Sequence, residues 1–178
     1  MIICAEVPTR LLLEARPGAG KTTALRRLAD LLRESRVTVA GFTTEEVRER
    51  GKRVGFTVES VGGEAGTLAH VDLPGPPRVG RYGVDLEGFE RVALPSLEAP
   101  RDAVVLIDEL GKMELASERF RAAVERLFDG PHALAATLQV ARHPFTEALR
   151  RRPAVEVIRL TAANRAKLPE QLAERLRA

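Results

Sequence analysis

Apolar runs of strand length alternate with amphipathic segments of helical period along most of the chain. Strand-length runs are found at residues 10–15, 37–44, 103–107, 132–140 and 155–160. Helical patterns predict helices at residues 21–36, 85–94, 117–128, 144–151 and 169–178. This alternation is typical of an α/β domain with a mostly parallel sheet, because parallel strands need a crossover, usually a helix, between them.

Local features refine this assignment. Residues 103–107 (AVVLI) have charged residues on both sides, which is typical of a strand buried on both faces. Ser117 has a hydroxyl that can cap the helix after it, and Pro95 is expected to end the helix at 85–94.

Residues 45–71 follow a different pattern. Short β-prone runs are separated there by Arg50-Gly51 and by Gly62-Gly63, which predicts an antiparallel meander with glycine turns. The Pro- and Gly-rich residues 73–80 are expected to form an exposed connector without regular structure. We therefore expect one domain over residues 1–178, with the meander at about residues 45–71 inside it.

Composition and charge exclude several classes of protein. Of the 178 residues, 44% are hydrophobic and 30% are charged, which supplies a core and excludes a disordered chain. The net charge of +3 is small, so a protein that binds nucleic acid mainly through charge is disfavoured. Cys4 is the one cysteine and cannot form an internal disulfide, and no apolar run approaches the ~18 residues that span a bilayer. We expect a cytoplasmic protein with no membrane partner.

The strongest functional motif is residues 15–23 (ARPGAGKTT), between a predicted strand and a predicted helix. A phosphate loop needs glycines that let backbone N–H groups turn inward, a lysine that reaches the terminal phosphates and a hydroxyl that holds Mg²⁺. Gly18, Gly20, Lys21 and Thr22 supply these in order. The alternative is a tight turn from strand to helix that binds no ligand. The predicted nucleotide-binding residues of this motif are Ala15, Arg16, Pro17, Gly18, Ala19, Gly20, Lys21, Thr22 and Thr23.

The start of this motif departs from the usual pattern. Ala15 stands where the pattern G-x-x-x-x-G-K-[ST] has its first glycine. Glu14 lies beside it, and its carboxylate would repel a triphosphate unless the side chain points away. The wrapping part of the loop keeps its glycines, so we expect the departure to affect binding strength more than fold.

A second motif, residues 106–114 (LIDELGKME), overlaps the end of the central apolar run. An aspartate at the end of a buried strand can hold the hydration shell of Mg²⁺, and Asp108 is placed for that role. Glu109 could polarise a water molecule for attack on the γ-phosphate, which a hydrolase needs and a kinase does not. The alternative is that the Asp-Glu pair only caps the segment that follows. Together with Lys21, the motif predicts one Mg²⁺-nucleotide site.

Five blocks of the sequence together resemble the THEP-type, or cancer-related, family of small P-loop nucleoside triphosphatases. The blocks are residues 17–23 (PGAGKTT), 41–56 (GFTTEEVRERGKRVGF), 106–115 (LIDELGKMEL), 142–145 (RHPF) and 161–169 (TAANRAKLP). The resemblance implies a P-loop NTPase fold, RecA-like or adenylate-kinase-like, with helices on both faces of the sheet and the meander as an insertion. It also implies slow, Mg²⁺-dependent hydrolysis of several nucleoside triphosphates, such as ATP and GTP, to diphosphate and phosphate.

The same resemblance implies roles for individual residues. Lys21 and Thr22 match the phosphate and metal groups of the family. Asp108 matches its Walker B aspartate, and Glu109 matches its proposed base. The expected catalytic residues are therefore Glu109 and Lys21, and the expected metal ligands are Thr22 and Asp108.

Other polar residues have two interpretations each. Asn164, after the last strand, could contact a base edge or cap the terminal helix. Arg48 and Lys112 are candidates for an additional cation at the γ-phosphate, although such charged residues are mostly exposed to solvent. The arginines at 150–152 lack interleaved aromatic residues, which favours a solvated helix end over an RNA site.

Two other functions share the same motifs. A small-molecule kinase would use the same loop and Asp108, but it would need an acceptor pocket, and Glu109 argues against it. A non-catalytic nucleotide-binding switch is favoured if the loop with Ala15 does not support hydrolysis. We expect nucleoside triphosphates as partners, no nucleic acid, and a monomer.

Overall fold

The computed structural model describes residues 8–177, so the predictions that involve Cys4 lie outside the described residues. Within this range, no helix is long and apolar enough to cross a membrane. The elements are β1 (Arg10–Ala15), α1 (Lys21–Glu34), β2 (Val39–Glu49), β3 (Lys52–Ser60), β4 (Ala65–His70), β5 (Arg78–Val79), β6 (Tyr82–Val84), α2 (Leu86–Ser96), β7 (Val104–Ile107), η1 (Glu114–Ala116), α3 (Glu118–Asp129), β8 (Leu134–Gln139), α4 (Pro144–Arg150), β9 (Val155–Arg159) and α5 (Leu168–Leu176).

The nine strands of residues 8–177 form one sheet, in the order β5-β6-β4-β3-β2-β7-β8-β1-β9. The pairs β2–β7, β7–β8, β8–β1 and β1–β9 are parallel, which confirms the predicted sheet. In this order β8 lies between β7 and β1, so the carboxyl ends of β7, β8 and β1 are neighbours at one edge. That edge is where ligands of open α/β sheets bind.

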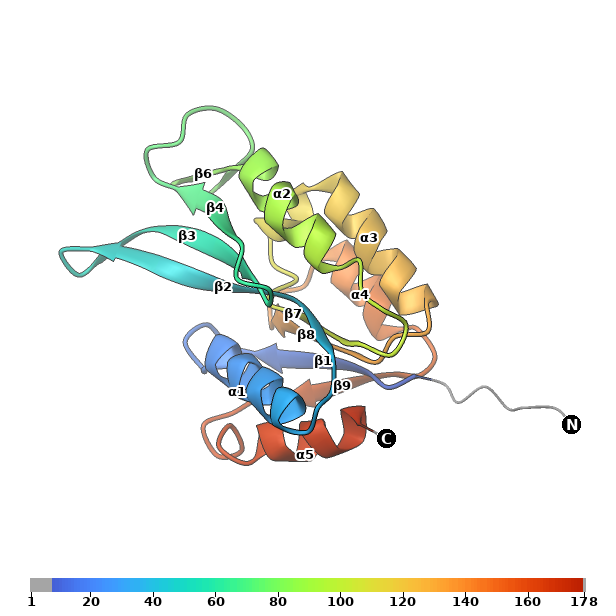
Figure 1. Ribbon diagram of the computed structural model, residues 1–178. Coiled ribbons are helices and arrows are strands. Elements are labelled where there is room, and N and C mark those ends of the chain that lie inside the picture. The colour runs from blue at the N-terminus through green and yellow to red at the C-terminus, as the bar shows by residue number, and fades with distance from the viewer. Residues whose placement is uncertain (1–7, 178) are drawn as a thin grey trace, which may run out of the picture.

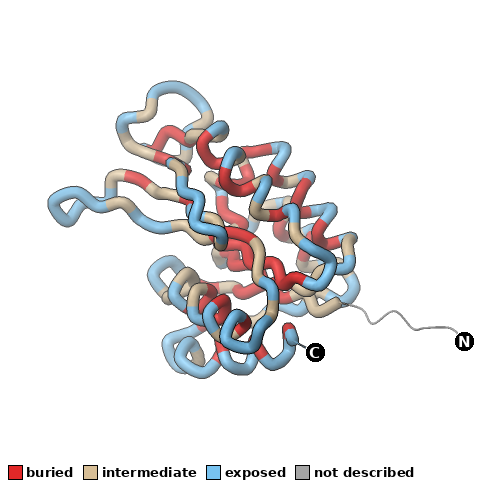
Figure 2. Tube along the Cα trace, in the orientation of Figure 1, coloured by how far each residue is buried: buried red, intermediate tan, exposed pale blue. Residues whose placement is uncertain are grey.

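Helices cover both faces of the parallel part of the sheet (Figure 1). Helices α1 and α5 lie on one face, and α2, α3 and α4 lie on the other. Each layer has its own apolar core, and the strands between them are buried along the centre (Figure 2). The predicted α/β fold with helices on both faces is therefore confirmed.

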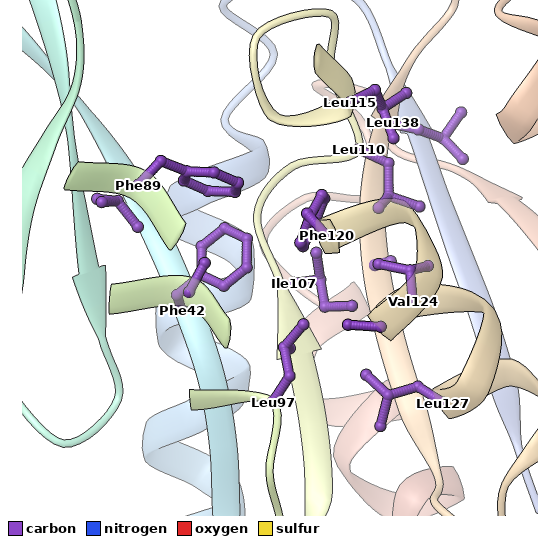
Figure 3. Packing of buried hydrophobic residues seen from close by; sticks show 14 of the residues in the cluster. Phe42, Phe89, Leu97, Ile107, Leu110, Leu115, Phe120, Val124, Leu127 and Leu138 are labelled. Carbon is purple, nitrogen blue, oxygen red and sulfur yellow. The ribbon is translucent and has the colours of Figure 1, made fainter. Parts of the chain in front are cut away.

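Three phenylalanines form the centre of the core on the α2–α3 face (Figure 3). Phe42 comes from β2, Phe89 from α2 and Phe120 from α3, and none of the three is exposed. Their ring centroids are 5.1–5.7 Å apart in edge-to-face arrangements, which aromatic rings favour. The cluster fixes both helices to the strand that runs beside β7.

The end of α2 differs from the prediction. The helix continues to Ser96, with Pro95 inside its last turn, instead of ending before the proline. The turn closes because the amide of Leu97 donates to the carbonyl of Leu94. Ser117 caps α3 as predicted, since its hydroxyl accepts from the amide of Phe120.

The predicted meander is present, but it continues the sheet. β2 pairs with β7 through Phe42 and then runs on to Glu49 as the first strand of a hairpin with β3. The hairpin projects beyond α1, and its tip is exposed (Figures 1 and 2). Gly41 permits the β2–β7 pairing, because its φ is 109° and an added Cβ would lie 1.8 Å from the carbonyl oxygen of Leu106.

The connector at residues 73–80 was predicted to lack regular structure, and this is wrong at its end. Arg78–Val79 forms β5, which pairs with β6 at the edge of the sheet. Strands of two and three residues are too short to show an alternating pattern, so the sequence does not reveal them.

We predict that Phe89→Ala lowers the free energy of unfolding by about 3–5 kcal/mol, because it leaves a cavity at the centre of the aromatic cluster. Chemical denaturation would measure the change. Val157→Ala is the control, since this side chain on β9 is 39% exposed and its loss should cost less than about 1 kcal/mol. Equal costs for the two substitutions would contradict this account of the core.

Candidate active site

The phosphate loop connects the carboxyl end of β1 to α1. Ala15 is the last residue of β1, pairs in register with Gln139 of β8 and buries its methyl group in the core. Its position in a regular strand explains why glycine is not required there. Gly18 and Gly20 have φ values of 76° and 93°, a left-handed conformation that favours glycine.

The beginning of α1 is open to an anion. Gly20 occupies the cap position and offers no side chain, so the first-turn amides have no side-chain cap among the described residues. Lys21 and Thr22 are the first two residues of this turn, and Thr23 is exposed beside them. The helix dipole adds partial positive charge at the same place. The motif thus has the geometry of a phosphate cradle.

Asp108 follows β7 and connects the phosphate loop to β8. Its carboxyl group accepts hydrogen bonds from the hydroxyls of Thr22 and Thr137, both at 2.5 Å. The residue is only 1% exposed. This burial raises the pKa of Asp108 above its ordinary value, against the opposing effect of the two hydroxyl donors, and the charge of Glu109 raises it further.

Glu109 faces the lysine of the loop. Its Oε2 lies 3.2 Å from Nζ of Lys21, and its Oε1 accepts from Nε2 of Gln139 at 2.6 Å. The side chains of Lys21 and Glu109 are 10% and 16% exposed, so the ion pair is shielded but reachable. The structure therefore brings the predicted pairs Thr22–Asp108 and Lys21–Glu109 together at one edge of the sheet.

A third carboxyl group, that of Glu114, lies close to this pair. It is 4% exposed and belongs to the short helix η1. A Cβ on Gly111 would be 2.7 Å from Oε2 of Glu114 and 2.8 Å from Oε1 of Glu109, so both carboxyl groups face this glycine. Burial, and then the charge of Glu109, raise the pKa of Glu114 well above its ordinary value.

The carboxylate of Glu14, next to the phosphate loop, is neutralised by an arginine of α4. Its Oε1 lies 2.6 Å from Nη2 of Arg150 on α4, and both side chains are 19% exposed. Arg152 pairs with Asp129 at 2.5 Å. Residues 150–152 are therefore only in part the solvated helix end that was predicted, because Arg150 and Arg152 make structural ion pairs.

In residues 8–177, the other candidates form no hydrogen bond or ion pair with this cluster. Arg48 pairs with Glu46 at 2.6 Å on the hairpin, and Lys112 is exposed. Asn164 does not cap α5, whose cap position is Lys167 without a side-chain hydrogen bond. Its amide instead bonds backbone groups of its own loop, so the predicted contact with a base edge stays a prediction.

Three further polar groups belong to the site and were not predicted from the sequence, those of Thr137, Gln139 and Glu114. Thr137 and Gln139 lie near the carboxyl end of β8, and polar residues at such an end could have indicated them. Glu114 gave no such indication, because its burial depends on how the segment after Asp108 folds back.

A glycine-rich loop follows β1, and a carboxylate pair follows β7, with β8 between the two strands. This arrangement is typical of a phosphate-loop nucleotide-binding protein. A family model described as NTPase matches residues 10–173. The chain belongs to this family, which confirms the resemblance seen in the motifs.

Relatives of the chain agree with this assignment. It is 42% identical to nucleoside-triphosphatase THEP1 of Thermotoga petrophila, over 92% of this chain and 90% of that protein. It is 41% identical to the human cancer-related nucleoside-triphosphatase, over 84% of this chain and 86% of that protein. The crystal structure of THEP1 from Aquifex aeolicus superposes with a TM-score of 0.86 at 32% identity, covering 96% of this chain and all of that one.

We predict that Glu114→Gln makes the protein more stable at neutral pH and flattens the pH dependence of its stability. The raised pKa means that the folded state holds this proton more tightly than the unfolded chain does. In the wild type, the stabilisation that comes from this bound proton is therefore complete below the unfolded pKa of about 4.3. It is lost as the pH rises through the folded pKa.

Thermal unfolding without nucleotide, at pH values from below about 4.3 up to above neutrality, would measure this change in stability. Glu118→Gln is the control, because Glu118 is an exposed glutamate at the start of α3. Curves of wild type and Glu114→Gln that stay parallel at every pH would contradict the prediction.

Proposed function

We propose that the protein hydrolyses nucleoside triphosphates to nucleoside diphosphate and phosphate with Mg²⁺, with broad specificity for the base. One observation carries the proposal: Lys21 of the phosphate loop lies 3.2 Å from Glu109, beside a buried Asp108 that is hydrogen-bonded to Thr22. These contacts support the proposal, because Lys21 would bind phosphate, Glu109 would act as general base, and the oxygens of Thr22 and Asp108 would hold the metal. The names of the relatives support the same activity.

Substrate binding begins with an exchange of ion-pair partners. The backbone amides from Gly18 to Thr22 would surround the β- and γ-phosphates. Lys21 would leave Glu109 for the phosphate oxygens, which are stronger and more numerous acceptors. This exchange frees Oε2 of Glu109 next to the γ-phosphate. Because these contacts do not involve the base, they accept any nucleoside triphosphate.

The side chains at the loop fit a Mg²⁺ ion. Thr22 and Asp108 offer oxygen donors, which this hard cation prefers. The hydroxyl of Thr22 can keep donating its hydrogen to Asp108 while a lone pair of the same oxygen faces the ion. Within residues 8–177, no three His, Cys, Asp or Glu side chains form a metal site of their own. Bound Mg²⁺ would neutralise the charge that develops on the phosphates.

Glu109 would act as the general base. Gln139 holds Oε1 at 2.6 Å, so Oε2 is the oxygen available to accept a proton from the attacking water. A kinase has no use for a carboxylate that activates water here, which favours hydrolysis over transfer to a small-molecule acceptor. We also infer that the protein works as a cytoplasmic monomer.

Glu109→Gln is expected to lower kcat by about 10²–10⁴-fold, because the amide cannot take a proton from water. Nucleotide binding should not weaken, since the phosphate loop is intact and Lys21 no longer has a carboxylate partner to leave. Phosphate release measures the first effect and calorimetric titration the second. Glu118→Gln serves as the matched control, and near wild-type turnover in Glu109→Gln would remove Glu109 from the proposed role.

Lys21→Ala is expected to weaken nucleotide binding itself by at least about 10-fold, because a charge-assisted contact to the phosphates is lost. Calorimetric titration with ADP and with ATP would measure the change in affinity. Lys52→Ala is the control, since Lys52 is an exposed lysine at the start of β3. An unchanged affinity in Lys21→Ala would count against the whole nucleotide site.

A further inference from the structure

Arg165 is an arginine beside the phosphate loop that the proposed mechanism does not use. It belongs to the segment between β9 and α5. Its Cδ and Nη1 lie 3.8 and 4.0 Å from the position that a Cβ on Gly20 would occupy. The side chain is exposed and forms no ion pair with the residues that the structure describes, unlike Arg150 and Arg152.

The loop that carries Arg165 is held in place by Asn164. The side-chain oxygen of Asn164 accepts from the amide of Thr161 at 2.8 Å, and its nitrogen donates to the carbonyl of Arg159 at 2.8 Å. The amide of Arg165 also donates to the carbonyl of Thr161 at 3.0 Å. These bonds fix the backbone, so the position of Arg165 over the phosphate loop follows from the fold of its own segment.

The order of the strands indicates which end of a nucleotide would meet Arg165. Glu109 and Asp108 follow β7, and their hydrogen-bond partners Thr137 and Gln139 lie on β8, so the γ-phosphate would lie on the β8 side of β1. If the phosphate chain crosses the loop with its γ-phosphate on the β8 side, the nucleoside lies toward the other neighbour of β1. That neighbour is β9, and Arg165 lies on the segment that follows it.

We propose that the guanidinium of Arg165 stacks on the base of the bound nucleotide. The proposal rests on the proposed nucleotide site. A guanidinium is planar and stacks on aromatic ring systems, and every base presents such a face. The phosphates already have Lys21 and the loop amides as partners, which leaves Arg165 available to the nucleoside. A contact that stacks on the base without reading its edges can be made with every nucleoside triphosphate.

The test compares ADP with inorganic pyrophosphate as ligands of the full-length protein in calorimetric titrations with Mg²⁺. Arg165→Ala is expected to weaken ADP binding about 3- to 30-fold, which is the range of a cation–π contact. Pyrophosphate, which has no base, should bind as to the wild type. Arg165→Lys should stay weak for ADP, because lysine keeps the charge but loses the plane. Lys167→Ala, an exposed cation on the same segment, should bind both ligands normally.

Three results would overturn the proposal. They are unchanged ADP affinity in Arg165→Ala, a parallel loss for ADP and pyrophosphate, and full rescue by Arg165→Lys. The second and third would assign Arg165 to the phosphates. If the wild type binds ADP with this dependence on Arg165 but releases no phosphate from ATP, hydrolysis fails while the base contact stands. If the wild type binds neither ligand, the nucleotide site and the base contact are both rejected.

Discussion

The carboxyl group of Asp108 joins three segments of the chain that are far apart in sequence. It accepts from Thr22 at the start of α1 and from Thr137 on β8, while its own residue follows β7. Burying this group is unfavourable unless its oxygens are hydrogen-bonded, and both hydroxyl contacts of 2.5 Å meet that need. The relative positions of the phosphate loop and the carboxylate pair depend on this one polar junction.

The parallel pairing of β7, β8 and β1 makes the junction possible. Parallel strands end at the same edge, so the loop after β1 and the Asp108–Glu109 pair after β7 meet across β8. The ion pair of Lys21 with Glu109 then has two consequences for the site. It neutralises a cation beside a helix N-terminus, and it would hold Glu109, the proposed general base, until phosphates compete for the lysine.

The sequence alone was sufficient to predict the parts of the site that lie in continuous motifs. An apolar strand precedes both the loop at residues 15–23 and the pair Asp108–Glu109. The apolar pattern of each strand and the residue types of each motif can be recognised in a short stretch of sequence. Gln139, Glu114 and Arg165 could not be assigned in the same way, because their roles depend on which segments the fold brings together. The run from β2 into the hairpin was divided wrongly, since pairing changes from parallel to antiparallel within one strand that has no break in sequence.

The most direct test of the account is the release of phosphate from ATP by the wild-type protein, measured with Mg²⁺ and with EDTA, and without any acceptor molecule. Multiple turnovers are expected with Mg²⁺ and no acceptor, and activity should be lost when the metal is removed. Tight ATP binding without phosphate release would contradict this expectation and support a nucleotide-binding switch. Release that requires an added acceptor would indicate a kinase.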